Sequence, residues 1–247
     1  MLSPHTTSAS KALPRRLGLI FPPAGRGVPE EGLAMYGDRI EYLIETLGLE
    51  TMTPDGYDAV IDRIGPAAKQ LAERGAEAIV LMGTSLSFYR GEEFNRVLTN
   101  RLQEASRVAC TTMSTAITDG LKAVGARKVV VATAYNETVN ERVRAFLAEH
   151  GFTVLAVKGL GIEAVEDISS VTQPQLIEFG ASVVSSAPQA DALLISCGGL
   201  RTLEILAPLE ARTKIPAVSS TPHALRAGAR LVGLDGKVAG YGALLSR

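Results

Sequence analysis

Cys197 is the residue in this sequence whose position best suits chemistry. It directly follows the apolar run Ala192–Ser196 and precedes Gly198 and Gly199, so its thiol would stand between the end of a buried strand and the start of a helix. A thiol in such a loop is accessible to a ligand and lies near a helix dipole, which suits catalysis. A lone cysteine is equally often a buried structural residue, and position alone leaves both interpretations open.

Gly83, Thr84 and Ser85 follow a second apolar run, Ala78–Met82. Glycine allows the backbone to approach a ligand closely, and hydroxyl groups can hold a carboxylate without a charged partner. Thr84 or Ser85 could instead cap a helix, and capping can occur together with ligand binding because one helix N-terminus offers both. We therefore regard this loop as a candidate carboxylate site.

Tyr135 follows a third apolar run, and its hydroxyl could donate to an oxyanion. Taken alone, such a tyrosine is more often a packed aromatic residue with a satisfied hydroxyl. Residues 112–115 and 219–221 are also rich in hydroxyl groups, and each segment is a weak candidate by itself. We interpret Cys110 as a core residue and His223 as an ordinary loop or helix-start residue.

The sequence contains no motif that would hold a cofactor or a metal. It has no Gly-x-x-x-x-Gly-Lys-Ser/Thr phosphate loop, no Gly-x-Gly-x-x-Gly fingerprint after a strand and no Gly-x-Ser-x-Gly elbow. The three histidines and two cysteines lack metal-ligand spacing, and we expect two free thiols. We therefore expect no cofactor and no metal. A thiol with neutral donors suits proton transfer at a carbon next to a carboxylate.

Short apolar runs alternate with longer amphipathic stretches, which indicates strand–helix units on a parallel sheet and hence an α/β fold. Apolar residues make up 46% of the 247 positions, which is enough for a substantial core. The pattern predicts strands at 17–21, 78–82, 110–113, 128–132, 152–157, 192–196 and 217–219. It predicts helices at 57–74, 114–124, 137–150, 172–186 and 201–213.

Charge and hydropathy exclude two classes of partner. The formal net charge of −1 provides no positive field for a polyphosphate, so we expect no nucleic acid partner. Every apolar run is far shorter than the roughly 20 residues that span a bilayer, so we expect no membrane partner and a cytoplasmic protein. Residues 1–16 have no apolar stretch of signal-peptide length, and we expect them to form a disordered leader.

Residues 76–86 and 190–200 are similar to each other, because each is an apolar strand that follows an acidic residue and ends in small or hydroxylated residues. Each segment offers backbone N–H groups at a helix N-terminus to an anion. Any parallel sheet repeats such turns, but the similarity also fits two equivalent halves across a cleft. We therefore expect two flavodoxin-like or Rossmann-like domains, one formed by residues 17–115 and 220–247 and the other by residues 116–219.

Six segments resemble the arylmalonate decarboxylase family, in the same order along the chain. They are Phe21–Ala24, Thr53–Asp58, Leu81–Gly91, Cys110–Ala116, Ala132–Tyr135 and Ser196–Leu200. The resemblance extends from about Leu17 to Tyr241 and includes the wider aspartate/glutamate racemase superfamily. It implies two α/β halves about a pseudo-two-fold axis, with the substrate between them.

Members of that superfamily are similar in placing one cysteine from each half on opposite faces of the substrate. Here Gly83 stands where a racemase, hydantoin racemase or maleate isomerase would have its first cysteine. A single thiol then implies protonation from one side and one enantiomer of product. The resemblance implies cofactor-independent decarboxylation of an α-aryl or alkenyl malonate, with Cys197 protonating a planar enediolate.

The resemblance also implies the surroundings of the substrate. The retained carboxylate would be held by Thr84, Ser85, Tyr135 and Gly198, the last through its backbone amide. Gly83 would leave room for the aryl ring. The departing carboxylate would lie in an apolar pocket without positive charge. The pocket residues are Pro22, Pro23, Leu49, Met52, Tyr57, Val165 and Ile168. Within it, Met52 and Ile168 depart from the family pattern, as does the bulkier Phe21 beside it, and these departures bear on substrate size.

The expected partner is thus a small dicarboxylate substrate, and we expect the chain to act as a monomer. The alternative function is that of a racemase or cis–trans isomerase of the same superfamily, of the hydantoin racemase or maleate isomerase type. Such an enzyme would need an unusual second base. A third hypothesis is a carboxylate-binding module, for which the hydroxyl-rich loops suffice and the thiol is incidental.

Overall fold

Within residues 13–247, the part of the chain that the structure describes, eight strands form two parallel sheets; the structure is a computed structural model. The first sheet has the order β2-β1-β3-β4, with β1 (Arg15–Phe21), β2 (Ile40–Thr46), β3 (Ala78–Leu81) and β4 (Ala109–Thr112). The second has the order β6-β5-β7-β8, with β5 (Lys128–Thr133), β6 (Thr153–Gly159), β7 (Ala192–Ser196) and β8 (Ala217–Ser219). The two orders are equivalent. In such sheets, ligands bind at the carboxyl ends of the strands where the order reverses, here β1 with β3 and β5 with β7.

Helices connect the strands and cover the sheets. Those of the first half are α1 (Glu30–Tyr36), α2 (Pro54–Val60), α3 (Ile64–Glu73), α4 (Thr84–Phe88) and α5 (Gly91–Ser106). The others are α6 (Met113–Ala123), α7 (Glu137–Glu149), α8 (Gln173–Ser185), α9 (Leu203–Thr213) and α10 (Ser220–Leu231). Short 3-10 helices occur at Gly37–Arg39, Ile61–Arg63 and Val165–Ser170.

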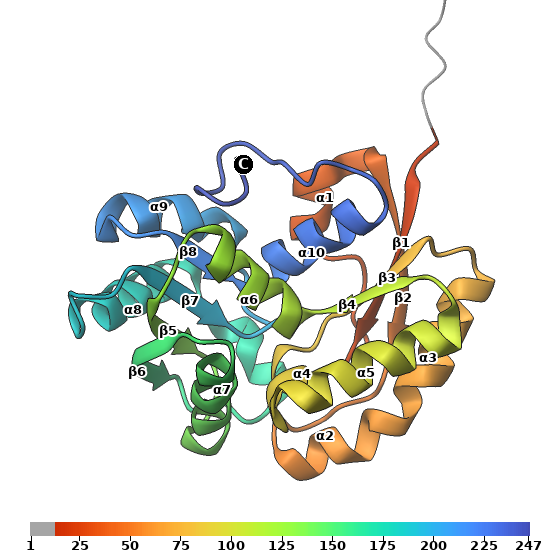
Figure 1. Ribbon diagram of the computed structural model, residues 1–247, viewed down its shortest axis with the longest axis horizontal. Helices are drawn as coiled ribbons and strands as arrows, with labels where there is room; N and C mark the ends of the chain where they lie inside the picture. Colours follow the sequence, from red (N-terminus) through yellow and green to blue (C-terminus); the bar gives the residue numbers. More distant parts are fainter. Residues whose placement is uncertain (1–12) are drawn as a thin grey trace, which may run out of the picture.

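Helices α6 and α10 lie between the two sheets and join the halves (Figure 1). α10 follows the last strand of the second sheet, yet it packs against β3 and β4 of the first sheet. α6 follows β4, yet it packs against β7 and β8. The two helices also pack against each other, so each half is closed by a helix whose sequence follows the other half. The division into domains of residues 17–115 plus 220–247 and 116–219 stays a prediction.

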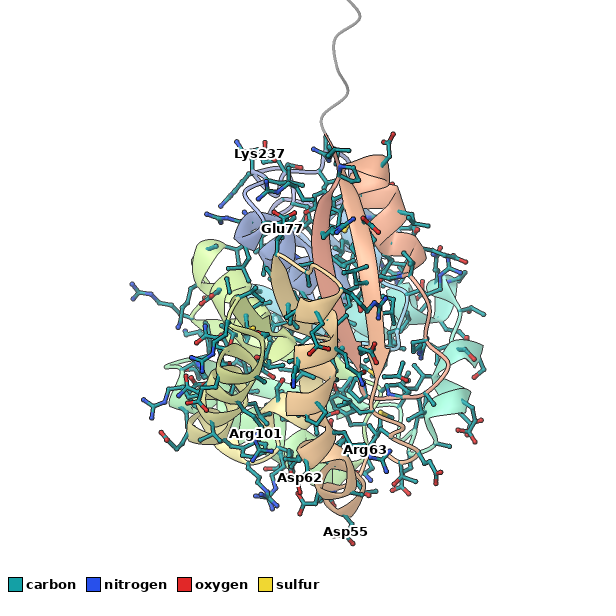
Figure 2. All side chains as sticks on the ribbon, turned by 90° about the vertical axis from the view of Figure 1, so that its right-hand side faces the viewer. Asp55, Asp62, Arg63, Glu77, Arg101 and Lys237 are labelled. Carbon is teal, nitrogen blue, oxygen red and sulfur yellow. The ribbon has the colours of Figure 1, made fainter. Side chains whose placement is uncertain are left out.

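The local sequence explains where several elements begin and end. β1 stops before Pro22, which has no amide to donate to a neighbouring strand. Thr112 and Asn136 cap α6 and α7, because their side chains accept hydrogen bonds from backbone amides in the first turn. β3 and β7 are buried along their whole length, as expected for continuously apolar strands of a parallel sheet. Polar residues such as Asp55 and Asp62 project outward from the helical layer of the first half (Figure 2).

The predicted α/β fold is confirmed, and each predicted strand corresponds to an observed one with ends that differ by at most two residues. The prediction omits β2 and the helices α1, α5 and α10, and it gives α4 only as a helix that begins near Thr84 or Ser85, without an end. β2 escapes the apolar pattern because Glu41 and Glu45 interrupt it at a sheet edge. The predicted helix 57–74 is wrong as a single element, since the chain changes to a 3-10 turn at Ile61–Arg63 just before Pro66 in the first turn of α3.

Residues 1–12 of the predicted disordered leader lie outside the described residues. The end of that leader at residue 16 is wrong, because Arg15 and Arg16 are the first residues of β1 and pair with Ile40 and Glu41 of β2. An ion pair of 2.9 Å between Arg16 and Glu41 adds to the backbone pairing. In the described part of the chain, none of the helices combines the length and the apolar character that crossing a membrane requires.

Candidate active site

A cavity with about 430 Å³ of empty space lies between the two sheets and opens to solvent. Its lining comes from the loops after β1, β2 and β3 and from the equivalent loops after β5, β6 and β7. The lining residues are Phe21, Pro22, Pro23, Arg26, Leu49, Met52, Met82, Gly83, Thr84, Ser85, Tyr135, Val165, Ile168, Cys197, Gly198 and Gly199. Both topological switch points therefore meet at one site, where open α/β sheets bind their ligands.

Gly83 and Cys197 occupy equivalent places in the two halves. β3 pairs with β1 and β4, and β7 pairs in the same way with β5 and β8. Ala78 and Ala192 begin these two strands, and Gly83 and Cys197 each stand five residues later. Both residues line the cavity, so the similarity between residues 76–86 and 190–200 reflects the repeated fold.

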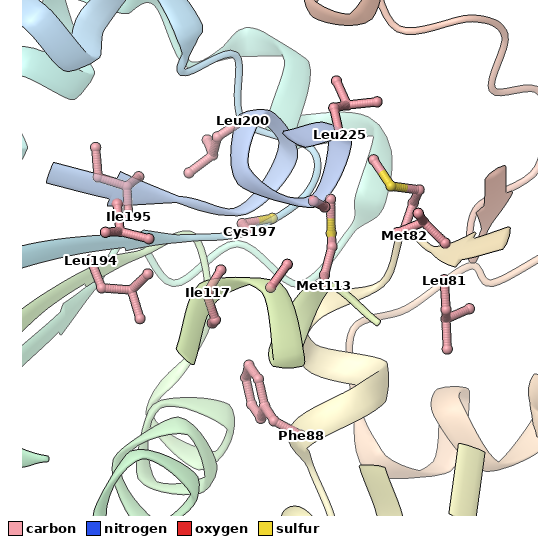
Figure 3. Close-up of a cluster of buried hydrophobic side chains, with 14 of the residues drawn as sticks. Leu81, Met82, Phe88, Met113, Ile117, Leu194, Ile195, Cys197, Leu200 and Leu225 are labelled. Carbon is pink, nitrogen blue, oxygen red and sulfur yellow. The ribbon is translucent and has the colours of Figure 1, made fainter. Parts of the chain in front are cut away.

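Cys197 lies at the carboxyl end of β7 with its side chain almost fully buried. Figure 3 shows its sulfur directed toward Met113, with Met82 of the first half beyond. Burial raises the pKa of Cys197 to about 11, and hydrogen bonds from the backbone amides of Gly199 and Leu200 oppose that rise only in part. The thiol is therefore protonated at neutral pH, which suits a proton donor rather than a nucleophile.

The cavity contains hydroxyl groups from both halves. Thr84 Oγ1 lies 2.9 Å from Ser220 Oγ and 3.2 Å from Met113 Sδ, and it is placed to donate to either. The Tyr135 hydroxyl lies 3.4 Å from Ser196 Oγ, and either oxygen can be the donor. Burial raises the pKa of Tyr135 well above its ordinary value, so the phenol is neutral and keeps its proton. These groups can donate hydrogen bonds to an anion without carrying charge themselves.

The predicted site residues other than Tyr57 all line this cavity, and their roles stay predictions. Tyr57 is not among the lining residues, because its side chain is fully buried, and its place in the substrate pocket stays a prediction. Its ring packs against Tyr89 with 4.9 Å between the ring centroids, which holds it within the core. Its hydroxyl has no hydrogen-bond partner among residues 13–247. Burial raises the pKa of Tyr57 well above its ordinary value, with the Ser85 side chain opposing that rise, so Tyr57 supports the wall near Ser85.

Arg26 is a lining residue that the sequence analysis missed. It follows β1 in a short loop between Gly25 and Gly27, and its side chain is half-buried. Its charge lowers the pKa of Cys197, although less than burial raises it. The apolar pocket is therefore bordered by a positive charge. A cation in a glycine-flanked loop after the first strand is the signal that could have identified it.

The weaker candidates divide into core and supporting residues. Cys110 is buried as a free thiol and lies 3.5 Å from Ser106 Oγ, as the core interpretation predicts. Thr221 Oγ1 donates to the Gly198 carbonyl at 3.0 Å and so supports the loop after Cys197. His223 is buried, and its burial lowers its pKa to about 4, so the imidazole is neutral at physiological pH.

The family model, a sequence relative and a solved structure that match this chain are all described as arylmalonate decarboxylases. A family model described as arylmalonate decarboxylase matches residues 17–245. The chain is 44% identical over 229 residues to an arylmalonate decarboxylase of Bordetella bronchiseptica, which covers 92% of this chain and 95% of the relative. It is 24% identical over 243 residues to a maleate isomerase of Nocardia farcinica (strain IFM 10152), which covers 94% of this chain and 95% of the relative. A crystal structure of an arylmalonate decarboxylase double mutant in the liganded form superposes with a TM-score of 0.90 at 43% identity, over 93% of this chain and 98% of that one.

Proposed function

Because this chain belongs to the arylmalonate decarboxylase family, as the resemblance of its motifs indicated, we propose that it is a carboxy-lyase acting on an α-aryl or alkenyl malonate. The reaction releases carbon dioxide and leaves an enantioenriched α-aryl carboxylic acid. One observation carries the proposal: a single thiol, kept protonated by burial, shares one cavity with neutral donors from both halves of the fold.

The bond that breaks joins the α-carbon to the departing carboxylate. Carbon dioxide leaves, and the electron pair remains on the α-carbon and spreads into the retained carboxylate as a planar enediolate. The Cys197 thiol then gives its proton to the α-carbon, and the thiolate recovers a proton from water. The pKa of about 11 supports this role, because the thiol is fully protonated when the enediolate forms.

The retained carboxylate gains negative charge as the enediolate forms, so donors placed around it stabilise the transition state more than the ground state. We assign this role to the hydroxyl groups of Thr84, Ser85 and Tyr135 and to the backbone amides of Ser85 and Gly198. For Thr84, the proton now directed at Ser220 or Met113 has to turn toward the substrate. A single donor of this kind is typically worth about 3–4 kcal/mol.

The departing carboxylate is best accommodated by the apolar side of the cavity, where Leu49 and Met52 of the first half face the loop with Val165 and Ile168. The antiparallel bridge between Thr51 and Ala164 holds these two loops together. An anion in apolar surroundings loses the hydration that stabilises it, whereas neutral carbon dioxide does not need that hydration. The apolar wall therefore favours loss of carbon dioxide.

The test uses purified protein, phenylmalonate and no added metal or nucleotide, with carbon dioxide release and phenylacetate followed together. We expect turnover by the wild type and near-complete loss in Cys197→Ala, with circular dichroism showing an intact fold. Cys110→Ala is the matched control and should retain activity, because Cys110 lies in the core beside Ser106. Full activity of Cys197→Ala would remove the thiol from the mechanism.

The same preparation tests the other two hypotheses. Inversion of a single-enantiomer α-phenylpropionate with deuterium uptake from heavy water, and without carbon dioxide release from phenylmalonate, would indicate a racemase. Thermal stabilisation by phenylacetate without any turnover would indicate a carboxylate-binding module.

A further inference from the structure

Arg26 stands at the junction of the active-site cavity and a second cavity. The second cavity has about 770 Å³ of empty space and shares Phe21, Arg26, Gly198 and Gly199 with the first. Nη2 of Arg26 lies 3.4 Å from the point where a Cβ on Gly199 would stand, and Ile168 lies 3.0 Å from the same point. The guanidinium thus sits at the boundary of the two cavities, beside the glycine loop that follows Cys197.

No side chain that the structure describes is paired with Arg26, although Glu50 and Glu166 line a third cavity that Arg26 also borders. Within residues 13–247 it forms no hydrogen bond or ion pair. Arg201, the other cation of the second cavity, forms an ion pair of 2.5 Å with Glu30. Glu31 in the same cavity accepts hydrogen bonds from the backbone amides of Thr202 and Leu203, both at 2.8 Å. Both carboxylates of the second cavity thus have partners, and the guanidinium of Arg26 keeps free donors on the side of that cavity.

Neither carboxylate of a malonate accounts for that charge. The retained carboxylate has its proposed donors in Thr84, Ser85 and Tyr135. The departing carboxylate benefits from apolar surroundings, and a guanidinium bound to it would stabilise the anion and oppose the loss of carbon dioxide. The remaining part of the substrate is the aryl group, which can extend past Gly198 and Gly199 into the second cavity.

We propose that Arg26 is a specificity-determining residue that selects malonates whose aryl group carries an anionic substituent, such as a ring carboxylate, directed into the second cavity. The inference rests on the proposed function and adds the substrate class to it. A guanidinium binds a carboxylate through two parallel hydrogen bonds, whereas a methyl group, which is smaller and accepts no hydrogen bond, would leave the buried part of the guanidinium without a partner. The enzyme would therefore distinguish the two substrates in two ways. Arg26 attracts the ring carboxylate, and the methyl-substituted ring displaces water from Arg26 without replacing its hydrogen bonds.

The experiment compares phenylmalonate with phenylmalonates that bear a carboxylate or a methyl group at the meta or para position. For the wild type we expect kcat/KM to favour the ring carboxylate over the methyl group at least about tenfold at one of the two positions, the factor for a hydrogen bond to a charged group. Arg26→Met should abolish or reverse that preference, and Arg26→Lys should retain part of it. The quantity compared between variants is the ratio of kcat/KM for the ring carboxylate to kcat/KM for phenylmalonate, because Arg26 lines the active-site cavity and its loss acts on both substrates.

Arg201→Met is the matched control, because Arg201 lines only the second cavity and is already paired with Glu30. It should keep most of the preference for the ring carboxylate. Equal preferences in the wild type and Arg26→Met would overturn the proposal.

A binding measurement separates failure of this inference from failure of the proposed function. Calorimetry compares the affinities of carboxyphenylacetate and methylphenylacetate for the wild type and Arg26→Met. If no malonate is decarboxylated, the proposed function fails, and a preference for carboxyphenylacetate that Arg26→Met removes still supports the role of Arg26. The absence of any such preference in the wild type contradicts it.

Discussion

Thr84 and Ser220 connect the two halves of the molecule through a hydrogen bond of 2.9 Å between their hydroxyl groups. Thr84 is the first residue of α4, after the first sheet, and Ser220 is the first residue of α10, after the second. The same Ser220 oxygen accepts a hydrogen bond of 3.2 Å from the backbone amide of Cys197. One buried hydroxyl thus contacts a proposed carboxylate donor and the backbone of the proposed acid.

Replacing Ser220 should impair turnover without removing any group that touches the substrate. Ser220→Ala leaves the Cys197 amide unsatisfied and frees Thr84, so we expect kcat for phenylmalonate to fall about tenfold, the equivalent of one lost hydrogen bond to a buried group. Ser220→Thr, which keeps the hydroxyl, should restore part of the rate. Ser106→Ala is the control, because this buried serine donates to Leu102 far from the cavity. A kcat for Ser220→Ala within twofold of wild type would contradict the assignment.

The pH dependence of turnover should reflect a thiol that is difficult to ionise. Burial raises the pKa of Cys197 from 9.0 to about 11, so the acid stays protonated, and kcat should not decline from loss of this proton between about pH 7 and pH 9. Between about pH 9 and pH 11 the thiol ionises in the unfolded chain but stays protonated in the folded chain. The contribution of Cys197 to the free energy of unfolding is therefore lost as pH rises through this range. The difference in thiolate absorbance between Cys110→Ala and the double variant Cys110→Ala/Cys197→Ala measures the Cys197 titration, because the six tyrosines contribute equally to both. A midpoint below about pH 8 would contradict the expected burial.

Introducing a second thiol at the equivalent position should allow protonation from both faces. Gly83→Cys with Cys197 retained should racemise single-enantiomer α-phenylpropionate, measured by chiral chromatography with deuterium uptake. A Cβ at Gly83 would stand 2.5 Å from Cγ of Pro22, so the loop must shift and the melting temperature should fall. Gly83→Ala is the matched control, since it adds the same Cβ without a thiol and should be destabilised without racemising. Racemisation by neither variant would indicate that the two strand ends do not face one substrate.

Glu31 should make stability depend on pH near neutrality. Burial raises its pKa from 4.5 to about 7, while the amides of Thr202 and Leu203 oppose that rise. The folded state binds the proton more tightly, so the free energy of unfolding should fall as pH rises from about 4.5 through about 7, by at most about 3 kcal/mol. Urea unfolding across this range measures the slope.

Glu31→Gln should make the free energy of unfolding independent of pH in this range. The glutamine oxygen can still accept hydrogen bonds from the backbone amides at the start of α9, and the amide does not titrate. Glu30→Gln is the control, since Glu30 is an exposed neighbour paired with Arg201. It should leave the slope unchanged. A slope that persists in Glu31→Gln would assign the titration to another group.

Much of the fold and part of the site follow from local sequence. Apolar runs such as those of β3 and β7 predict buried parallel strands, because such a strand needs apolar side chains on both faces. The position of Cys197 directly after one of them predicts a residue at the carboxyl end of a sheet. Edge strand β2 and the split between α2 and α3 were not predictable in this way, since periodicity is weak where one face is exposed or where a proline interrupts a helix.

The sequence by itself determined the α/β class, the single thiol after β7, the glycine at the equivalent place after β3 and the hydroxyl-rich loop beside it. Only the tertiary structure decided which loops share the cavity. It brought Arg26 to its border, excluded Tyr57 from its lining and placed Ser220 between Thr84 and Cys197. The physical reason is that strand and turn signals arise from neighbours along the chain, whereas these contacts arise from the packing of α6 and α10 between two sheets, which no local pattern specifies.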